Sequence, residues 1–156
     1  MSAPLAPGTP APAFSGTIQY GTTRSLADYA GKMLALYFYP KDDTPGCTAQ
    51  ACDLNTHLAD LRAAGIEVLG VSADGAASHT KFIAKYGLGF DLLADTEKTV
   101  HQAFGVWGPK KFMGRSYDGT HRTTFLIDGE GIIQHVITKP NTKAHAAEIL
   151  AAVAAV

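Results

Sequence analysis

The sequence predicts an α/β fold in which helices flank a central mixed β-sheet. Residues 33–39 (MLALYFY) form an unbroken run of apolar and aromatic residues, which is typical of a strand buried on both faces. A second such run, 66–71, follows a segment of helical periodicity, so strand, helix and strand predict a right-handed parallel crossover. Runs 123–127 and 132–137 are joined by Asp-Gly-Glu-Gly, which predicts an antiparallel hairpin.

Helix start and stop signals place the helices around these strands. Thr44 is expected to be the N-cap and Pro45 the first residue of a helix that carries leucines at helical spacing and ends at Gly65. The other helices are expected to have these limits: an end at Gly87, a cap at Asp95 with an end at Gly105, and a start at Ala144 that leads into the alanine-rich tail. A parallel crossover first, with an antiparallel hairpin and a helix last, is the order of a thioredoxin-like domain.

Composition indicates one globular domain. The chain has 156 residues, of which 46% are hydrophobic and 17% charged. Four of the eight prolines lie in residues 1–13, which we interpret as an extended N-terminal arm before a single domain over residues 14–156. A formal net charge of -1 gives no sign of a nucleic-acid partner. No apolar run approaches the roughly 20 residues that cross a membrane, and residues 1–13 lack the features of a secretory signal, so we expect a cytoplasmic protein.

Cys47 is the strongest candidate for a reactive residue. If Thr44 caps the helix and Pro45 begins it, Cys47 is the third helical residue, where unpaired N–H groups and the helix dipole favour an anion. A thiolate is such an anion, and it is the nucleophilic form of cysteine. The alternative is an inert buried cysteine, since Cys47 shares a helix face with Ala51 and Leu54. The Thr-Pro-Gly-Cys context and the presence of a second cysteine favour the nucleophile.

Cys52 is the second cysteine, and two cysteines are too few for a disulfide scaffold. On an intact helix, five residues turn about 140° and rise about 7.5 Å, which places the two Cα atoms about 8.7 Å apart. A disulfide needs less than about 7 Å between them. Cys47 and Cys52 can therefore bond only if the first turns of the helix unwind, so we predict that oxidation is coupled to local unfolding. The alternative is that Cys52 is an unpaired bystander.

Several segments together resemble one known family. Residues 37–52 (YFYPKDDTPGCTAQAC), with VLGVSAD, VWGPKKFMG and HRTTFLID, are similar to the peroxiredoxins of the bacterioferritin-comigratory-protein or Q type. The resemblance implies a thioredoxin-like fold with an N-terminal β-hairpin extension. It also implies a monomer that reduces hydrogen peroxide and organic hydroperoxides without haem, flavin or metal, so no cofactor is expected.

The resemblance also implies roles for five residues. Cys47 matches the peroxidatic cysteine, Pro40 and Thr44 match the active-site proline and threonine, and Arg122 matches the active-site arginine. Cys52 matches the resolving cysteine of members that form an intramolecular disulfide. Taken without the family, Pro40 is equally well a strand terminator and Arg122 a solvated strand arginine.

These roles have physical reasons of their own. The Thr44 hydroxyl can orient a peroxide while the thiolate attacks one oxygen in line. The permanent charge of Arg122 would favour the thiolate and stabilise charge on the departing oxygen. Pro40 lacks an N–H and suits shielding of the pocket. Gln50 stands where many members of the family carry Glu; an amide cannot relay a proton but does not repel a thiolate, and whether it touches the substrate stays open.

We therefore expect a thiol peroxidase cycle. Peroxide oxidises Cys47 to a sulfenic acid, Cys52 condenses with it to a disulfide, and a dithiol, thioredoxin above all, reduces the bridge. A one-cysteine or glutathione-dependent peroxidase is the first alternative, and a redox-sensing or binding module without enzymatic activity is the second. A structural zinc or iron–sulfur site would need further ligands near the cysteines, where only Asp42, Asp43, Asp53 and His57 are close in sequence.

Overall fold

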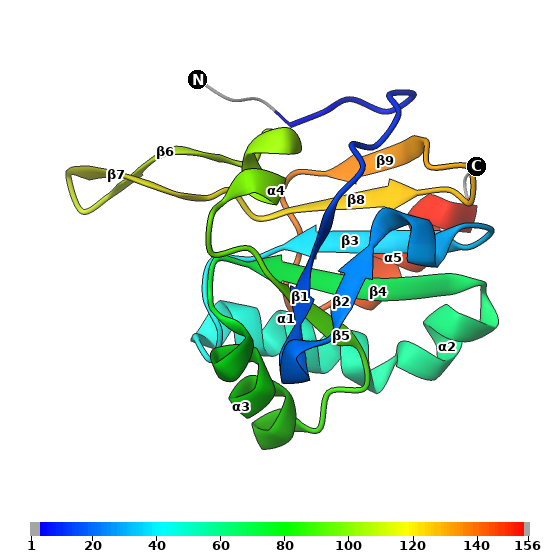
Figure 1. Cartoon of the computed structure of the whole chain (residues 1–156), viewed down its shortest axis with the longest axis horizontal. Helices are drawn as coiled ribbons and strands as arrows, with labels where there is room; N and C mark the ends of the chain where they lie inside the picture. Colours follow the sequence, from blue (N-terminus) through cyan, green and yellow to red (C-terminus); the bar gives the residue numbers. More distant parts are fainter. Residues whose placement is uncertain (1–3, 155–156) are drawn as a thin grey trace.

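The computed structural model describes residues 4–154, and it places a mixed sheet at the centre of the molecule (Figure 1). The sheet has seven strands in the order β2-β1-β5-β4-β3-β8-β9. Their bounds are Ser15–Ile18 (β1), Thr23–Ser25 (β2), Met33–Phe38 (β3), Ile66–Ser72 (β4), Asp91–Ala94 (β5), Thr123–Ile127 (β8) and Ile133–Ile137 (β9). The predicted α/β fold with a mixed central sheet is confirmed, and β1 and β2 form the expected N-terminal hairpin.

The predicted crossover lies in the middle of the sheet. β3 and β4 are parallel, with Met33 opposite Ile66 and Phe38 opposite Val71, and β8 pairs antiparallel with the other edge of β3. Side chains of β3 alternate between two cores: Tyr37 faces one and Phe38 the other. Both faces are covered, which explains why the strand has no polar positions.

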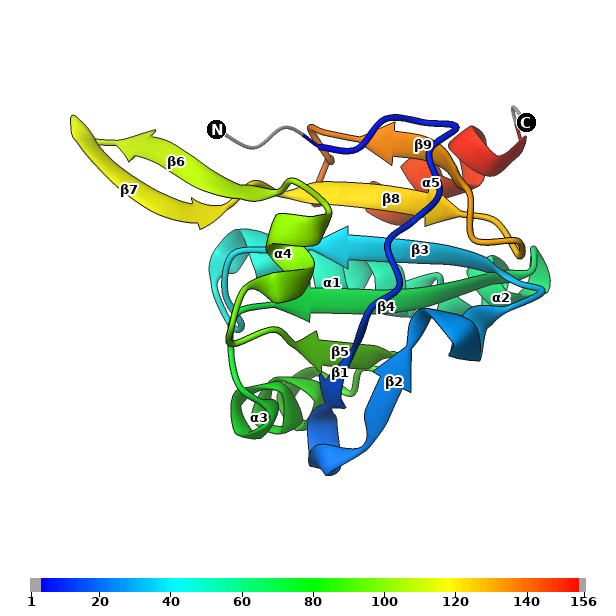
Figure 2. The ribbon, with the colours of Figure 1, turned by 45° about the horizontal axis from the view of Figure 1, so that its top comes forward.

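Helices cover the two faces unequally (Figure 2). One core is packed by α1 (Pro45–Thr56), α2 (Leu58–Ala63), α3 (Ala76–Tyr86) and α5 (His145–Ala154). The other is packed by α4 (Thr99–Ala103) and by the N-terminal segment. Within residues 4–154, no helix combines the length and the apolar character needed to cross a membrane.

The helix expected from Pro45 to Gly65 is in fact two helices. The chain breaks at His57, whose φ and ψ are -104° and 15°. Asn55, Thr56 and His57 are three successive residues of low helix propensity, and the Thr56 hydroxyl donates to the Cys52 carbonyl at 2.9 Å. The expectation of one helix was wrong because the leucine spacing continues across the break. Gly65, in the left-handed region at φ 80°, still ends the helical segment.

The limits of the other helices agree with expectation, with one correction. α3 ends at Gly87, which adopts a left-handed φ of 63°. Asp95 is not the N-cap of α4, since Lys98 holds that position, but its carboxylate accepts the Val100 and His101 N–H groups at 3.2 and 2.8 Å. α5 begins at His145; residues 1–3 of the predicted arm and 155–156 of the predicted tail helix lie outside the described residues.

A second, smaller sheet was not predicted. β6 (Trp107–Phe112) and β7 (Arg115–Thr120) form an antiparallel hairpin that projects from the body of the molecule (Figures 1 and 2). Its turn places Met113 and Gly114 at positive φ, and the Met113 side chain is 86% exposed. The hairpin leads directly to residues 121 and 122, and so links this projection to the site described next.

Candidate active site

Cys47 lies in the first turn of α1, just beyond the end of β3. The loop of residues 39–44 joins the two elements, with Thr44 as the N-cap residue and Pro45 as the first helical residue, as predicted. Cys47 is 2% exposed and is a free thiol. Its position among the unpaired N–H groups of a helix N-terminus favours a negatively charged sulfur.

Arg122 supplies a positive charge directly at this sulfur. It precedes β8, and its Nη2 lies 3.4 Å from Cys47 Sγ. A Cβ atom at Gly46 would stand 3.3 Å from the same Nη2, so the glycine lets the guanidinium lie against the first turn of α1. A cation at this distance stabilises both a thiolate and the charge that develops on a leaving oxygen.

Gln50 is the second partner of Arg122. Its side chain is fully buried, and its Oε1 accepts a hydrogen bond from Arg122 Nη1 at 2.6 Å. Because a guanidinium only donates, this contact sets the orientation of the amide. The Gln50 Nε2 has no hydrogen-bond partner among the described residues.

Thr44 and Pro40 belong to the loop before α1. The Thr44 hydroxyl does not cap the helix; it donates to the Lys41 carbonyl at 2.9 Å. Its oxygen lone pairs therefore stay available to accept a hydrogen bond. Pro40 is half-buried and follows β3 by two residues. Among residues 4–154, no described polar contact joins either residue to Cys47.

Cys52 lies on the same helix, which is unbroken from Pro45 to Thr56. It is half-buried and, like Cys47, a free thiol. We call this arrangement, with an intact first turn, the closed conformation. A separation of five residues on an intact helix is too long for a disulfide.

Two side chains near Cys47 were not singled out from the sequence. Lys110 of β6 donates from Nζ to the Thr120 carbonyl at 2.8 Å; burial and nearby Arg122 lower its pKa, which Cys47 partly offsets. Tyr37 is fully buried, and its pKa is raised well above the usual value by burial and then by Cys47 and Asp42. The motif VWGPKKFMG contains Lys110, but it is the unpredicted hairpin that brings this lysine to the site.

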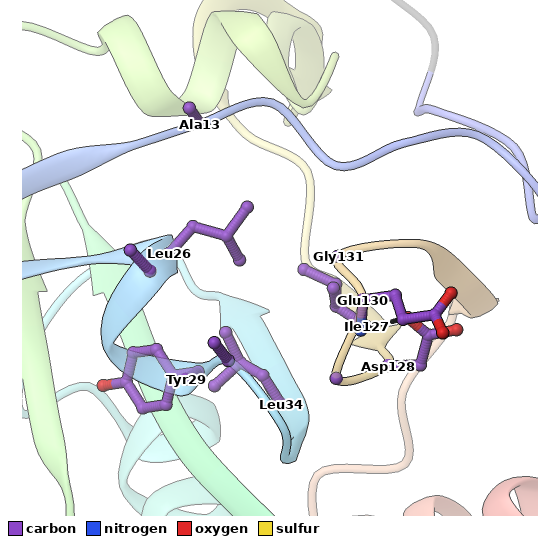
Figure 3. A pocket seen from close by; sticks show the side chains of 11 residues that line it. Ala13, Leu26, Tyr29, Leu34, Ile127, Asp128, Glu130 and Gly131 are labelled. Atoms are coloured by element: carbon purple, nitrogen blue, oxygen red, sulfur yellow. Dashed lines mark hydrogen bonds between the residues drawn. The ribbon is translucent and has the colours of Figure 1, made fainter.

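An apolar cavity of about 260 Å³ lies at the opposite end of β3 (Figure 3). Leu34, near the start of β3, lines it together with Leu26, Tyr29 and Ile127. Cys47 follows the other end of the strand, so this cavity is not part of the site. Among the described residues, no three His, Cys, Asp or Glu side chains gather as a metal site would require.

Comparison with known proteins agrees with this geometry. The sequence pattern of the AhpC/TSA family matches residues 7–136. Peroxiredoxin Bcp of Escherichia coli is 46% identical over 142 residues, which are 91% of each chain. Peroxiredoxin Bcp of Bacillus subtilis is 45% identical over 131 residues, which are 84% of this chain and 83% of the relative.

Solved structures share the fold. The bacterioferritin comigratory protein of Xanthomonas campestris, studied for alkyl peroxide reduction, superposes with a TM-score of 0.85 at 38% identity, and the match covers 91% of this chain and 90% of the other. BcpB of Mycobacterium tuberculosis superposes with a TM-score of 0.86 at 30% identity, over 97% and 98% of the two chains. The chain therefore belongs to the AhpC/TSA family and, within it, is a peroxiredoxin of the Bcp or Q type, a peroxidase of the oxidoreductase class.

Proposed function

We propose that Cys47 is the residue that reduces the hydroperoxide. The observation that carries this proposal is the 3.4 Å contact of Arg122 Nη2 with Cys47 Sγ at the N-terminus of α1. The thiolate attacks one peroxide oxygen, the O–O bond breaks, and Cys47 becomes a sulfenic acid. The departing oxygen takes a proton and leaves as water or an alcohol.

Thr44, Arg122 and Pro40 position the substrate in this proposal. The Thr44 oxygen, whose proton is engaged by the Lys41 carbonyl, accepts a hydrogen bond from the hydroperoxide O–H. Arg122 stabilises the negative charge that develops on the departing oxygen. Pro40 shields the pocket without offering a competing donor.

Cys52 completes the cycle as the resolving cysteine. The first turn of α1 opens, the Cys52 thiol attacks the Cys47 sulfenic acid, and water leaves as the disulfide forms. A dithiol protein, thioredoxin or a similar one, then reduces the bridge through a mixed disulfide. The half-buried position of Cys52 on the same helix supports this role over that of a distant bystander.

The proposal also covers the substrate class, the cellular location and the domain limits. Hydrogen peroxide and organic hydroperoxides are the proposed substrates, in accord with the alkyl peroxide reduction named for the Xanthomonas relative. A cytoplasmic location suits a catalyst that depends on reduced thiols. Residues 14–156 are proposed to act as one domain after the arm of residues 1–13.

We propose that the protein is a monomer. The support is that the N-terminal segment covers the start of the free edge of β9: the Gly8 N–H donates to the Ile133 carbonyl at 2.7 Å, and the Ile133 N–H donates to the Thr9 carbonyl at 3.0 Å. An edge strand that is partly covered offers fewer free N–H and C=O groups for pairing with a second copy.

Turnover of two single variants tests the cycle. With hydrogen peroxide, thioredoxin and its reductase, Cys47→Ser is expected to lose all activity because no nucleophile remains. Cys52→Ser is expected to react once and then to stop, since its sulfenic acid has no internal partner. Full turnover of Cys52→Ser with thioredoxin would contradict the two-cysteine cycle and support the one-cysteine alternative.

A further inference from the structure

A buried acid–histidine pair holds the loop before α1, outside the residues proposed to meet the peroxide. Asp42 lies in this loop, and its side chain is 4% exposed. His79 of α3 is fully buried, and its Nδ1 lies 2.7 Å from Asp42 Oδ2. The loop that carries Thr44 is thus attached to a neighbouring helix through a contact shielded from water.

Hydrogen-bond partners define the proton positions in this pair. His79 Nε2 lies 3.0 Å from the Leu93 carbonyl, which can only accept, so Nε2 carries a proton. His79 Nδ1 faces the Asp42 carboxylate, which also accepts when ionised. A proton therefore lies between Nδ1 and the carboxylate, and a hydrogen bond joins the two side chains.

Other groups complete the environment of Asp42. The Tyr39 hydroxyl donates to its Oδ1 at 2.5 Å and the Ser78 hydroxyl to its Oδ2 at 2.7 Å. Burial would raise the pKa of Asp42, but hydrogen bonds, first from His79 and then from Tyr39 and Ser78, outweigh it and hold the pKa below its ordinary value of 3.8. The Asp42 N–H donates to Asp74 Oδ2 at 2.8 Å, so backbone and side chain are both anchored.

The far end of α1 is anchored as well. Asp53 Oδ2 accepts the Ala146 N–H of α5 at 2.8 Å. The Asn55 amide binds the loop after α3, at the Gly87 carbonyl and the Gly89 N–H. The residues between the two anchors, 43–52, include both cysteines and the turn that has to open.

A second contact between the loop and α3 is weaker. Asp43 pairs with Lys85 at 2.8 Å and accepts a hydrogen bond from the Tyr86 hydroxyl at 2.7 Å, with the Asp43 and Lys85 side chains 44% and 58% exposed. Exposed ion pairs of this kind contribute little to the stability of a structure, because water and salt screen them. The buried Asp42 contact is therefore expected to hold the loop more strongly than the exposed Asp43 contacts do.

We propose, on the basis of the peroxidase cycle above, that the His79–Asp42 pair is a positioning element that holds Thr44 and Cys47 in the closed, peroxide-reactive conformation. When the pair is lost, the balance shifts toward the open conformation in which Cys52 reaches the Cys47 sulfenic acid. The first step of the cycle then slows, while the second does not.

The test compares Asp42→Asn with Asp95→Asn. Asp95 is a matched control: it is also buried, and its Oδ2 lies 2.6 Å from Nδ1 of the buried His101, on the α4 side of the sheet. Both variants are expected to lower the urea midpoint. Rapid mixing with hydrogen peroxide, acid quenching and mass spectrometry then count the thiol, sulfenic, disulfide and sulfinic forms.

For Asp42→Asn, the rate constant for oxidation of Cys47 is expected to fall about tenfold, because a small displacement of the reacting groups slows the reaction. Its disulfide is expected to form from the sulfenic acid at least as fast as in the wild type. With excess peroxide, a smaller share of Cys47 should therefore reach the sulfinic acid, because the second oxidation competes with opening. Asp95→Asn should keep both rate constants within about twofold of the wild type.

Equal slowing of both steps in Asp42→Asn, or an oxidation rate unchanged from the wild type, would overturn the proposal. If Asp42→Asn does not fold, Ser78→Ala removes one donor to Asp42 and should slow oxidation by about threefold to fivefold. Failure of the cycle itself has a different signature, since the wild type would then form no disulfide between residues 47 and 52.

Discussion

At the scale of single residues, one guanidinium joins two side chains of α1. The terminal nitrogens of Arg122 reach Cys47 Sγ at 3.4 Å and Gln50 Oε1 at 2.6 Å. Gln50 is neutral, so it orients Arg122 without neutralising its charge. A carboxylate at this position would share that charge, whereas the amide leaves it to the sulfur and to the developing oxyanion.

Replacement of Arg122 by lysine tests this arrangement. Arg122→Lys keeps the charge but loses the planar fork that contacts both partners. The rate constant for oxidation of Cys47 by hydrogen peroxide is expected to fall about 100-fold, as when one oriented donor is removed from an active site. Quenched-flow assays of free thiols measure this rate constant. Arg115→Lys, at an exposed position of β7, is the control. A rate within about threefold of the wild type would show that charge alone is enough.

Contacts between residues close in sequence could be predicted, whereas contacts between distant residues could not be predicted from a local pattern. The position of Cys47 at a helix start followed from Thr44 and Pro45, which are its near neighbours. Arg122 came from the family resemblance, since no local pattern ties it to a residue 75 positions away. The link between Asp42 and His79 spans 37 positions and was not predicted, because it depends on the packing of α3 against the loop.

At the scale of elements, α1 is held differently at its two ends. Its C-terminal part is fastened by Asp53 and Asn55 to the backbone of other elements. Its first turn is held by side-chain contacts to Cys47 and Gln50 and by the loop before it. Opening is therefore expected to begin at the first turn and to stop before Asp53.

Hydrogen exchange of the reduced and disulfide forms checks where α1 opens. Amides of residues 48–56 are expected to lose protection in the disulfide form, because the cysteines cannot meet on an intact helix and residues 53–56 donate to the carbonyls of residues 49–52. The amide of His57, which donates to the Asp53 carbonyl at 3.2 Å, and the amides of α3 should keep theirs. Unchanged protection over residues 48–52, or loss of protection at His57 as well, would contradict this division.

Elements with a strong local signal were predictable. The apolar runs of β3 and β4 and the glycines that end α2 and α3 were identified from the sequence. The short strand β5 and the hairpin β6–β7 were not. β6 mixes proline, glycine and lysines, and its turn at Met113 and Gly114 lacks the usual Asn-Gly or Asp-Gly signal. β6 and β7 are strands because their backbones pair with each other, which no local pattern in the sequence indicates.

At the scale of the whole molecule, three buried histidines on three different helices each face an acidic side chain. His79 and His101 contact Asp42 and Asp95, and His145 Nδ1 lies 2.9 Å from Glu148 Oε1. Burial lowers the pKa of His145 below 6.5, although Glu148 opposes the shift. Burial would raise the pKa of Asp95, but hydrogen bonds from His101 and from backbone N–H groups bring it below 3.8.

Stability is expected to fall with acid in two stages. Below pH 6.5 the unfolded chain protonates residue 145 more readily than the folded protein does, so the free energy of unfolding declines. Below pH 3.8 the unfolded chain protonates Asp42 and Asp95 first, and a steeper decline follows. Urea titrations at a series of pH values measure both stages. His145→Gln should abolish the first decline alone, and a first decline that persists in this variant would refute the assignment.

The most direct test of the catalytic account is a titration of the reduced protein with one equivalent of hydrogen peroxide, followed by peptide mass analysis. The account predicts that both thiols disappear together and that a single peptide pair, bridged between Cys47 and Cys52 within one chain, replaces them. A Cys47 that stays a thiol after this treatment, or a bridge found only between two chains, would contradict it.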